Sequence, residues 1–325
     1  MKTRITELLG VQYPIVEGGM QWVGRAELAA AVSNAGAFGM VTARTLQTPE
    51  DLLKEVHRTR ELTDKPFGIN LTLSLMAHDV SYDGWLDAIV ESGVKVVETA
   101  GNKPHLVIDR LKAHGIKIIH KCTSVRHACS AERAGVDVIS IDAFEAAGHP
   151  GEDDVPAMIL IPAARRAIRI PILASGGIAD GRSMAAALTL GADGVNMGTR
   201  FMMTRESAIH ENVKRTLVAA SELDTTLIKR TLKRTARFYA NAVSEEIVEL
   251  ERRPGGATYE DLKHLLSGNR GNAALAAGEI DSGLICASQV IGLIDDVPGC
   301  AEVVSRMVAE CRASLEVALS TYRGE

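Results

Sequence analysis

The feature that most constrains the fold of this chain is a repeated alternation of short β-rich runs with amphipathic helical stretches. Each run is short and ends on glycine, asparagine or serine, and a helical stretch of about ten to fifteen residues follows it. Eight runs qualify as strands: residues 14–20, 37–42, 67–73, 94–100, 117–123, 136–142, 171–175 and 194–198. Strands that alternate with helices indicate a parallel sheet, because each helix returns the chain to the edge where the next strand begins.

The segments between the strands carry the signals of helices. Helices are expected over residues 25–34, 49–62, 82–92, 105–114, 125–134, 158–168 and 181–190. Several of them end at a glycine that suits a C-terminal cap: Gly36, Gly93, Gly115, Gly135 and Gly191. Eight such units fit a closed (β/α)8 barrel, the TIM barrel, or an open doubly wound sheet. The number of strands and their short length favour the α/β TIM barrel.

The alternation stops after the eighth strand. Residues 206–279 form a charged, helix-rich segment that contains Pro254-Gly255-Gly256, which is typical of an insertion. We therefore expect residues 1–205 and 280–325 to form the barrel, and residues 206–279 to form a helical cap or substrate domain.

Composition and charge exclude several classes of protein. The net charge of −5 does not suit binding to a nucleic acid backbone. No apolar stretch reaches the roughly 18 residues of a membrane span, and the first residues lack a signal-peptide run, so a soluble cytoplasmic protein is expected. The five cysteines are widely spaced, which indicates neither disulfides nor a zinc site, and we expect no metal. One basic group recurs at helical spacing and predicts a solvated helix face, with a rim for an anionic ligand as the alternative: Lys229, Arg230, Lys233, Arg234 and Arg237.

Glycine turns follow the last two strands. Strand seven ends in Ser175-Gly176-Gly177, and strand eight ends in Gly198-Thr199. In a TIM barrel the active site lies at these strand ends, and the loops after strands seven and eight usually bind phosphate. Glycine lets backbone N–H groups approach phosphate oxygens closely. The turns therefore predict a phosphate site, with plain tight turns as the alternative.

The other strand ends are polar: Gly19, Met20 and Gln21 after strand one, then Asn70, Glu98, His120, Lys121 and Asp142. Buried polar groups are costly unless they serve a partner, and a heterocycle such as isoalloxazine needs both donors and acceptors. Lys121 would stabilise negative charge on a reduced ring. The alternative for Lys121 is a salt bridge to Asp142 or Glu98.

The loop after strand six carries His149 between Gly148 and Pro150. A constrained histidine at the mouth of a barrel suits a general base or a donor to a substrate anion. We expect the acidic residues at 152–154 to cap the next helix rather than to bind a metal.

Two further residues have two interpretations each. Cys122 is either a nucleophile at the barrel mouth or a packed core residue. Trp22 is either a shelf for a planar ring or a contact that fixes the first helix on the barrel.

Several segments together resemble the nitronate monooxygenase (2-nitropropane dioxygenase-like) family over nearly the whole chain: GGMQWVGRAELAAAVSNAG, FGINLTL, VVETAGN, KIIHKCTSVRHA, SIDAFEAAGHPGEDD, ASGGIADGR and NMGTRF. Through MQWVGRAE, HKCT, AGHPGEDD and GLIDD the chain is especially similar to the bacterial NADH:quinone reductase branch. The resemblance implies non-covalent FMN, with its phosphate at the two glycine turns.

The same resemblance implies positions for the remaining parts of the site. The flavin ring would lie near Gly19, Met20, Gln21, Asn70, Lys121 and Asp142, and His149 would face the substrate. The chain departs from the family at Cys286-Ala287-Ser288-Gln289, where relatives have Ser-Ala-Gly-Gln. Trp22, Cys286 and Ser288 are therefore expected on the substrate side.

Three functions remain open from the sequence. The first is an FMN oxidoreductase in which NAD(P)H reduces the flavin and a quinone reoxidises it. The second is oxidation of alkyl nitronates by O₂, and the third is a flavin-free phosphate-binding barrel, either an isomerase or a dehydrogenase that uses Cys122. A GxGxxG fingerprint is absent, so NAD(P)H would bind directly across the flavin. The expected partners are quinone, nitronate and nicotinamide, and a homodimer is left open.

Overall fold

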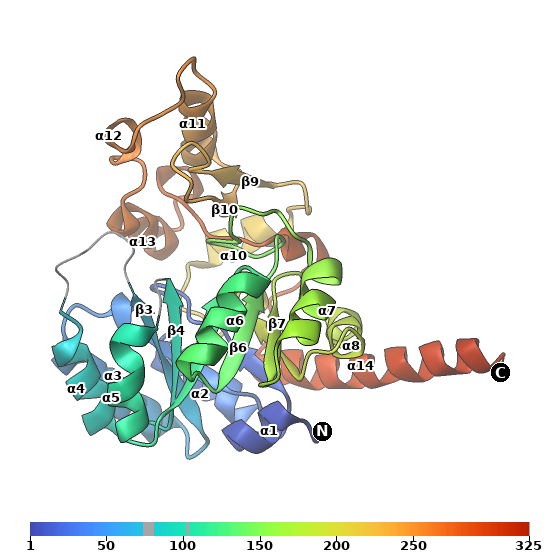
Figure 1. Ribbon diagram of the computed structural model, residues 1–325. Coiled ribbons are helices and arrows are strands. Elements are labelled where there is room, and N and C mark those ends of the chain that lie inside the picture. The colour runs from blue at the N-terminus through green and yellow to red at the C-terminus, as the bar shows by residue number, and fades with distance from the viewer. Residues whose placement is uncertain (74–80, 102–103, 325) are drawn as a thin grey trace.

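A closed parallel barrel forms the centre of the molecule (Figure 1). The computed structural model describes residues 1–73, 81–101 and 104–324. The barrel strands are β1 (Ile15–Glu17), β2 (Gly39–Thr42), β3 (Phe67–Leu73), β4 (Val96–Gly101), β5 (Lys117–Cys122), β6 (Val138–Asp142), β7 (Ile172–Ser175) and β8 (Gly194–Met197). They pair in the order β1-β8-β7-β6-β5-β4-β3-β2, and a parallel bridge between Val16 and Phe38 closes the circle. The predicted TIM barrel is confirmed.

Helices cover the outside of the barrel as the alternation predicts. They are α2 (Ala26–Asn34), α3 (Pro49–Leu62), α4 (Asp83–Ser92), α5 (His105–Ala113), α6 (Val125–Ala134), α7 (Ala157–Ala167) and α8 (Gly181–Thr189), with the short η1 (Ala43–Thr45) after β2. An additional helix, α1 (Arg4–Leu9), was not expected. A capping box at Thr3 begins α1 and Gly10 ends it with φ 69°. Both are local signals in the sequence that mark a helix.

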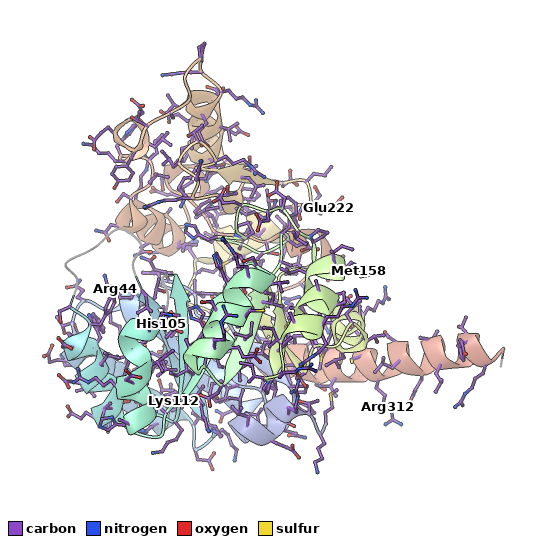
Figure 2. All side chains as sticks on the ribbon, viewed as in Figure 1. Arg44, His105, Lys112, Met158, Glu222 and Arg312 are labelled. Carbon is purple, nitrogen blue, oxygen red and sulfur yellow. The ribbon has the colours of Figure 1, made fainter. Side chains whose placement is uncertain are left out.

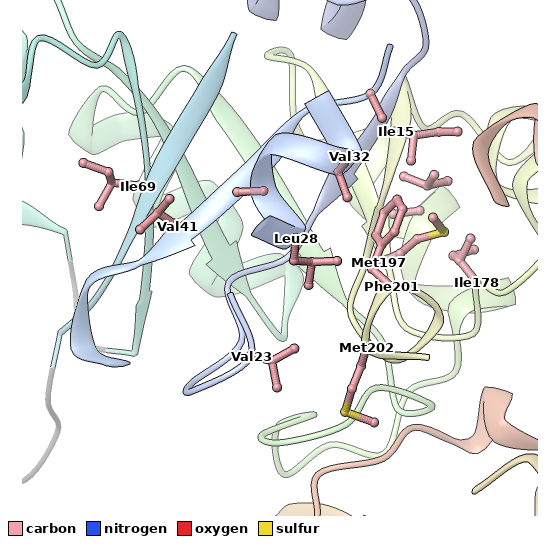
Figure 3. Packing of buried hydrophobic residues seen from close by; sticks show 14 of the residues in the cluster. Ile15, Val23, Leu28, Val32, Val41, Ile69, Ile178, Met197, Phe201 and Met202 are labelled. Carbon is pink, nitrogen blue, oxygen red and sulfur yellow. The ribbon is translucent and has the colours of Figure 1, made fainter. Parts of the chain in front are cut away.

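The core has two layers because successive residues of a strand face opposite sides. Val16, Phe38, Val96 and Leu173 fill the inside of the barrel, and Ile5 of α1 packs onto them at the closed end. The outer layer joins strands to helices, and Figure 3 shows Ile15, Leu28, Val32, Val41 and Ile69 in it. Strand residues that continue the inner row toward the carboxyl ends therefore point into the barrel mouth.

A second group of elements lies at one end of the barrel (Figure 1). It contains α9 (Thr199–Met202), α10 (Glu211–Val218), β9 (Thr225–Ile228), β10 (Ala236–Tyr239), α11 (Ala242–Glu251), α12 (Tyr259–Leu262), α13 (Gly268–Ala277), η2 (Ile280–Ser282) and η3 (Gln289–Leu293). Ile228, Phe238, Val243, Ile247 and Leu262 form a small core of their own. The boundaries 206–279 of a cap domain stay a prediction.

The basic group at residues 229–237 does not form a helix face, so that prediction was wrong. It lies on the antiparallel hairpin β9–β10, where Lys229 and Lys233 have φ angles of 62° and 51°. These left-handed residues belong to the turn and are incompatible with a continuous α-helix. The helical spacing of these five basic residues therefore did not predict the local secondary structure.

The chain ends in the long helix α14 (Cys300–Arg323). Its first half packs against α8 and buries Val304, Met307 and Cys311. Its second half extends away from the barrel, where Figure 2 shows Arg312. Among the residues that the structure describes, no helix is long and apolar enough to cross a membrane.

Candidate active site

The two glycine turns meet at the carboxyl ends of β7 and β8. Gly176 and Gly177 have φ angles of 84° and 77°, a conformation that glycine adopts without strain. In the described part of the chain, the N–H groups of Gly177, Gly198 and Thr199 donate no hydrogen bond. Free backbone donors at the mouth of a barrel are the groups that a phosphate needs.

A buried carboxylate, Glu98, connects the neighbouring strand ends. Its Oε1 accepts hydrogen bonds from the backbone N–H of Gly19 (3.0 Å) and from Asn70 Nδ2 (2.8 Å). Its Oε2 accepts from Asn196 Nδ2 at 2.7 Å, and the side chain is fully buried. Three hydrogen bonds to one carboxylate fix the loop after β1 against the neighbouring strand ends.

The network continues from Asn196 to the far side of the barrel. Asn196 Nδ2 also donates to Ser140 Oγ (3.1 Å), and Ser140 Oγ donates to Asp142 Oδ1 (3.5 Å). Asp142 Oδ1 lies 3.1 Å from Lys121 Nζ. Ser175 is paired in register with Asp142 and Asn196 and is buried beside them. A continuous polar layer therefore crosses the barrel mouth.

Lys121 is the cation of this layer. Burial lowers its pKa, but the carboxylates of Asp142 and Glu98 together outweigh that effect, so the pKa lies above its usual value. Lys121 is therefore ionised at neutral pH. The ion pair with Asp142 that we weighed as an alternative is present, and it leaves other N–H donors of the ammonium for a ligand.

Close packing explains two glycines after β1. A Cβ atom on Gly18 would lie 2.6 Å from Asn196 Oδ1, and one on Gly19 would lie 2.1 Å from Asn70 Cγ. Only glycine admits such an approach. Met20 follows, and its Sδ is 3.5 Å from the Cβ position of Gly198, so the loop after β1 reaches the turn after β8.

His149 lies where the loop after β6 meets the hairpin β9–β10. Its Nε2 is 3.0 Å from Lys229 Nζ. An ammonium can only donate, so Nε2 accepts and the ring is neutral. The residue is exposed overall, yet desolvation of its ring lowers the pKa of His149 to about 4. The charges of Lys229 and Arg234 add to that shift, and Glu152 opposes it.

The acidic residues after His149 do not cap helix α7, so that expectation was wrong. Glu152 accepts from Thr235, both N–H (2.7 Å) and Oγ1 (2.5 Å), and Asp154 pairs with Arg230 at 3.0 Å. The first N–H of α7 is instead bound by the carboxylate of Glu145. Glu152 and Asp154 therefore connect this loop to the hairpin. Helix-capping rules consider only residues close in sequence and cannot predict such long-range pairs.

Two expected polar residues lie away from the mouth. His120 and Cys122 occupy the outer face of β5, in the row of Ile118, which packs against the helices. His120 Nδ1 is 2.8 Å from Thr99 Oγ1, and burial raises the pKa of the Cys122 thiol. This geometry favours the packing interpretation of Cys122 over the nucleophile.

The expected residues near the cap have mixed surroundings. Gln21 is exposed, and its Nε2 is 3.3 Å from the Cβ position of Gly268 at the start of α13. Trp22 has φ 70°, and its ring stacks under the Arg25 guanidinium at 5.1 Å, which favours a packing role.

Ser288 and Cys286 lie on the segment before η3. The N–H of Ser288 donates to Thr199 Oγ1 (3.1 Å) and its Oγ to the Glu145 carbonyl (2.7 Å), so Ser288 supports the turn after β8. Cys286 is exposed as a residue, yet desolvation of its thiol raises the pKa to about 11. The positive charge of Lys229 offsets part of this increase.

Sequence reasoning missed three residues of this site. Asn196 and Ser140 join the polar layer, and Asn196 Oδ1 has no partner in the described structure. Glu17 is fully buried, and this burial raises its pKa well above the usual value. The hydrogen bond that Glu17 accepts from the Met40 N–H lowers the pKa in part, and the nearby charge of Glu98 raises it further. Period-two alternation from Val138 would have placed Ser140 beside Asp142, but no local signal marks Glu17.

Comparison with known proteins identifies the family of this chain. The model of the nitronate monooxygenase family matches residues 2–310. A probable nitronate monooxygenase of Staphylococcus aureus is 31% identical over 77% of this chain and 81% of its own. A (3aS,4S,5R,7aS)-5-hydroxy-7a-methyl-1-oxo-octahydro-1H-indene-4-carboxyl-CoA dehydrogenase of Rhodococcus jostii is 30% identical over 95% of this chain and 96% of its own.

The fold is shared with solved structures as well. FabK from Thermotoga maritima superposes with a TM-score of 0.91 at 35% identity, over 99% of both chains. The family is flavin-dependent in general. The chain therefore belongs to the nitronate monooxygenase family and is an oxidoreductase.

Proposed function

We propose that the protein is an FMN-dependent oxidoreductase of the NAD(P)H:quinone reductase type. The observation that carries the proposal is the convergence of two features at the barrel mouth. The free N–H groups of Gly177, Gly198 and Thr199 suit a phosphate, and the polar layer from Glu98 to Lys121 suits a heterocycle.

The residues present therefore fit FMN. The two glycine turns would hold its phosphate, and Met20, Asn70 and Lys121 would lie along its ring. When bound, FMN supplies a ring that accepts a hydride from NAD(P)H and delivers electrons to a quinone. Lys121 holds a fixed positive charge that favours the more negative, reduced form of that ring.

The remaining residues position these groups. Glu98 fixes Gly19, Asn70 and Asn196 at once, so the donors are oriented before a ligand arrives. Neutral His149 and the ammonium of Lys229 lie together where the barrel meets the hairpin. No GxGxxG fingerprint is present, so NAD(P)H would bind across the flavin beneath the hairpin.

The names of the relatives support an oxidoreductase without naming its electron donor or acceptor. The Rhodococcus jostii protein is named a dehydrogenase, and it matches nearly the whole chain. Anaerobic stopped-flow mixing with NADH and with NADPH tests the proposal. We expect loss of the oxidised flavin absorbance with at least one of them, and its return on addition of a quinone. Failure of both nucleotides to bleach the flavin would contradict the proposal.

Nitronate oxidation is the second candidate, because the Staphylococcus aureus relative carries that name. With a pKa of about 4, His149 is a weak base at neutral pH. It suits accepting a hydrogen bond better than removing a proton from a neutral nitroalkane. We therefore expect any oxygen uptake with propionate 3-nitronate to exceed that with the parent nitroalkane. No uptake above a control without enzyme removes this candidate.

A further inference from the structure

Lys229 has an unusual backbone for a lysine. It directly follows β9 with φ 62°, and its N–H is bound by Glu251 Oε2 at 2.8 Å. A non-glycine residue with positive φ costs free energy and persists only where surrounding contacts hold it. The side chain of Lys229 is thereby directed toward the loop that carries His149, where Nζ lies 3.0 Å from Nε2.

The ammonium of Lys229 has no carboxylate partner among the described residues. Its one hydrogen bond goes to the neutral ring of His149. Neighbouring cations of the hairpin differ, since Arg230 pairs with Asp154 and Arg237 donates to Thr225 and to the Phe144 carbonyl. Lys229 is half-buried, and this burial lowers its pKa, an effect that Cys286 opposes.

The nearby carboxylates are engaged elsewhere. Glu152 binds Thr235, Asp154 binds Arg230, and Glu251 binds the N–H groups of Lys229 and Thr231. Positive charge is therefore left at the junction of loop and hairpin, while the negative charges around it are already satisfied. A half-buried ammonium with unused N–H donors is a binding group for an oxyanion.

We propose that Lys229 and His149 form an oxyanion site at the barrel mouth, with Lys229 binding the anionic group and His149 positioning the ammonium. The ligand is a substrate that carries a phosphate, carboxylate or nitronate. The anion comes from the phosphates of NAD(P)H, from an anionic quinone that accepts electrons, or from a nitronate that donates them. This inference deepens the proposed function and rests on it only for the identity of those substrates.

The first test needs no turnover. In the purified protein, NMR titration of the His149 imidazole reports the nearby charge. Lys229 is only the second cause of the low His149 pKa, after desolvation, so we expect Lys229→Met to raise that pKa from about 4 by part of the distance to 6.5, and Lys229→Arg to keep it low. Lys233→Met is the matched control, because Lys233 lies in the same turn with φ 51° and, within the described structure, forms no hydrogen bond with His149. An unchanged His149 pKa in Lys229→Met overturns the pairing.

The second test measures anion binding with sodium pyrophosphate and sodium propionate as probes, followed through the His149 resonance. We expect binding to at least one probe in the wild type and in Lys229→Arg. Lys229→Met should weaken it about tenfold or more, and Lys233→Met should not. Equal binding by the wild type and Lys229→Met, or binding by neither, overturns the site. Both readouts remain valid if NAD(P)H fails to reduce the flavin.

The source of the anion follows from the two half-reactions. If NAD(P)H supplies it, Lys229→Met raises the Kd for the nucleotide and leaves the KM of every acceptor unchanged. If another substrate supplies it, the KM rises for a carboxylated quinone, which accepts electrons, or for a nitronate, which donates them, but not for the uncharged quinone of the same ring. An effect on neither half-reaction contradicts a substrate role for the site.

Discussion

At the scale of single residues, Glu98 is the side chain on which most of the candidate site depends. It accepts from Gly19, Asn70 and Asn196, which belong to three different parts of the barrel. The sequence predicted a polar residue at this strand end, because a plain core excludes a carboxylate. It did not predict the partners, since those bonds join residues 28 to 98 positions apart.

Two replacements of Glu98 distinguish the contribution of its negative charge from that of its hydrogen bonds. Glu98→Ala leaves the Gly19 N–H and Asn70 Nδ2 without an acceptor and removes one of two acceptors from Asn196 Nδ2, which should cost about 3–5 kcal/mol in the free energy of unfolding, with loss of flavin. Glu98→Gln should cost much less, because the Asn196 amide can flip and present its unpartnered Oδ1 to the new N–H group. Urea unfolding and flavin content measure both variants. Equal damage from the two would show that the bonds to Glu98 do not organise the site.

His120 gives the molecule a pH dependence of its own. Burial lowers its pKa to about 4, with smaller effects from His105 and His127, so the folded state resists protonation. Between pH 6.5 and 4 the unfolded chain binds more protons than the folded protein. The contribution of His120 to the free energy of unfolding is therefore fully present above about pH 6.5 and is lost as the pH falls toward 4. We expect a loss of about 3 kcal/mol across this window.

Unfolding by urea at several pH values checks this expectation. His120→Phe should make the profile less steep without abolishing it, because the lowered pKa of His149 acts over the same pH range. Thr99 keeps a partner in this variant in the carbonyl of Ile119. His57→Phe is the control, because His57 is an exposed residue of α3. A profile as steep in His120→Phe as in the wild type would assign the dependence to other groups.

At the scale of elements, the turns after the strands decide where ligand groups can lie. Gly19→Ala places a Cβ atom 2.1 Å from Asn70 Cγ, which the packed mouth cannot accommodate without moving Asn70. We expect loss of flavin and a cost of about 1–3 kcal/mol or more in the free energy of unfolding. Gly115→Ala is the control: its φ is 68°, but a Cβ atom there meets nothing within 4 Å.

Thermal unfolding and flavin content compare the two glycine variants. Gly115→Ala should cost about 1–2 kcal/mol from backbone strain and retain its flavin. Loss of flavin in both variants, or in neither, would contradict the role assigned to the loop after β1.

Elements were predictable where their signal is local and repeated. All eight barrel strands and the helices after them lie where hydrophobic periodicity and glycine caps placed them. The hairpin β9–β10 was missed because its strands have four residues each and a charged turn between them. Helix α1 was missed because it has six residues, too few for periodicity to identify.

At the scale of the whole molecule, the second half of α14 stands apart from the barrel (Figure 1). Leu315, Leu319 and Tyr322 are exposed along it, and no residue after Cys311 is buried up to residue 324. We expect a chain that ends at Arg312 to keep its flavin and to unfold within a few degrees of the wild-type Tm, because little packing is removed.

The matched control changes the buried half of the same helix. Met307→Ala should lower the free energy of unfolding by about 2–5 kcal/mol, because it opens a cavity against α8. A truncated chain that unfolds as readily as Met307→Ala would show that the exposed half supports the fold.

At this scale, the contacts between the barrel and the hairpin β9–β10 could not be predicted from the sequence. Glu152, Asp154 and His149 meet Thr235, Arg230 and Lys229 across about 80 residues. Each partner was visible in the sequence, but local rules assigned the acids to a helix cap and the bases to a helix face. Only the folded barrel brings the two segments together.

The central claim is that the barrel mouth binds FMN. The most direct measurement is the absorbance spectrum of the purified protein, followed by denaturation and mass determination of any released ligand. We predict a yellow protein that releases FMN intact, close to one per chain, and loses it in Glu98→Ala. A colourless protein that cannot be reconstituted with FMN would contradict the claim and favour a flavin-free phosphate-binding barrel.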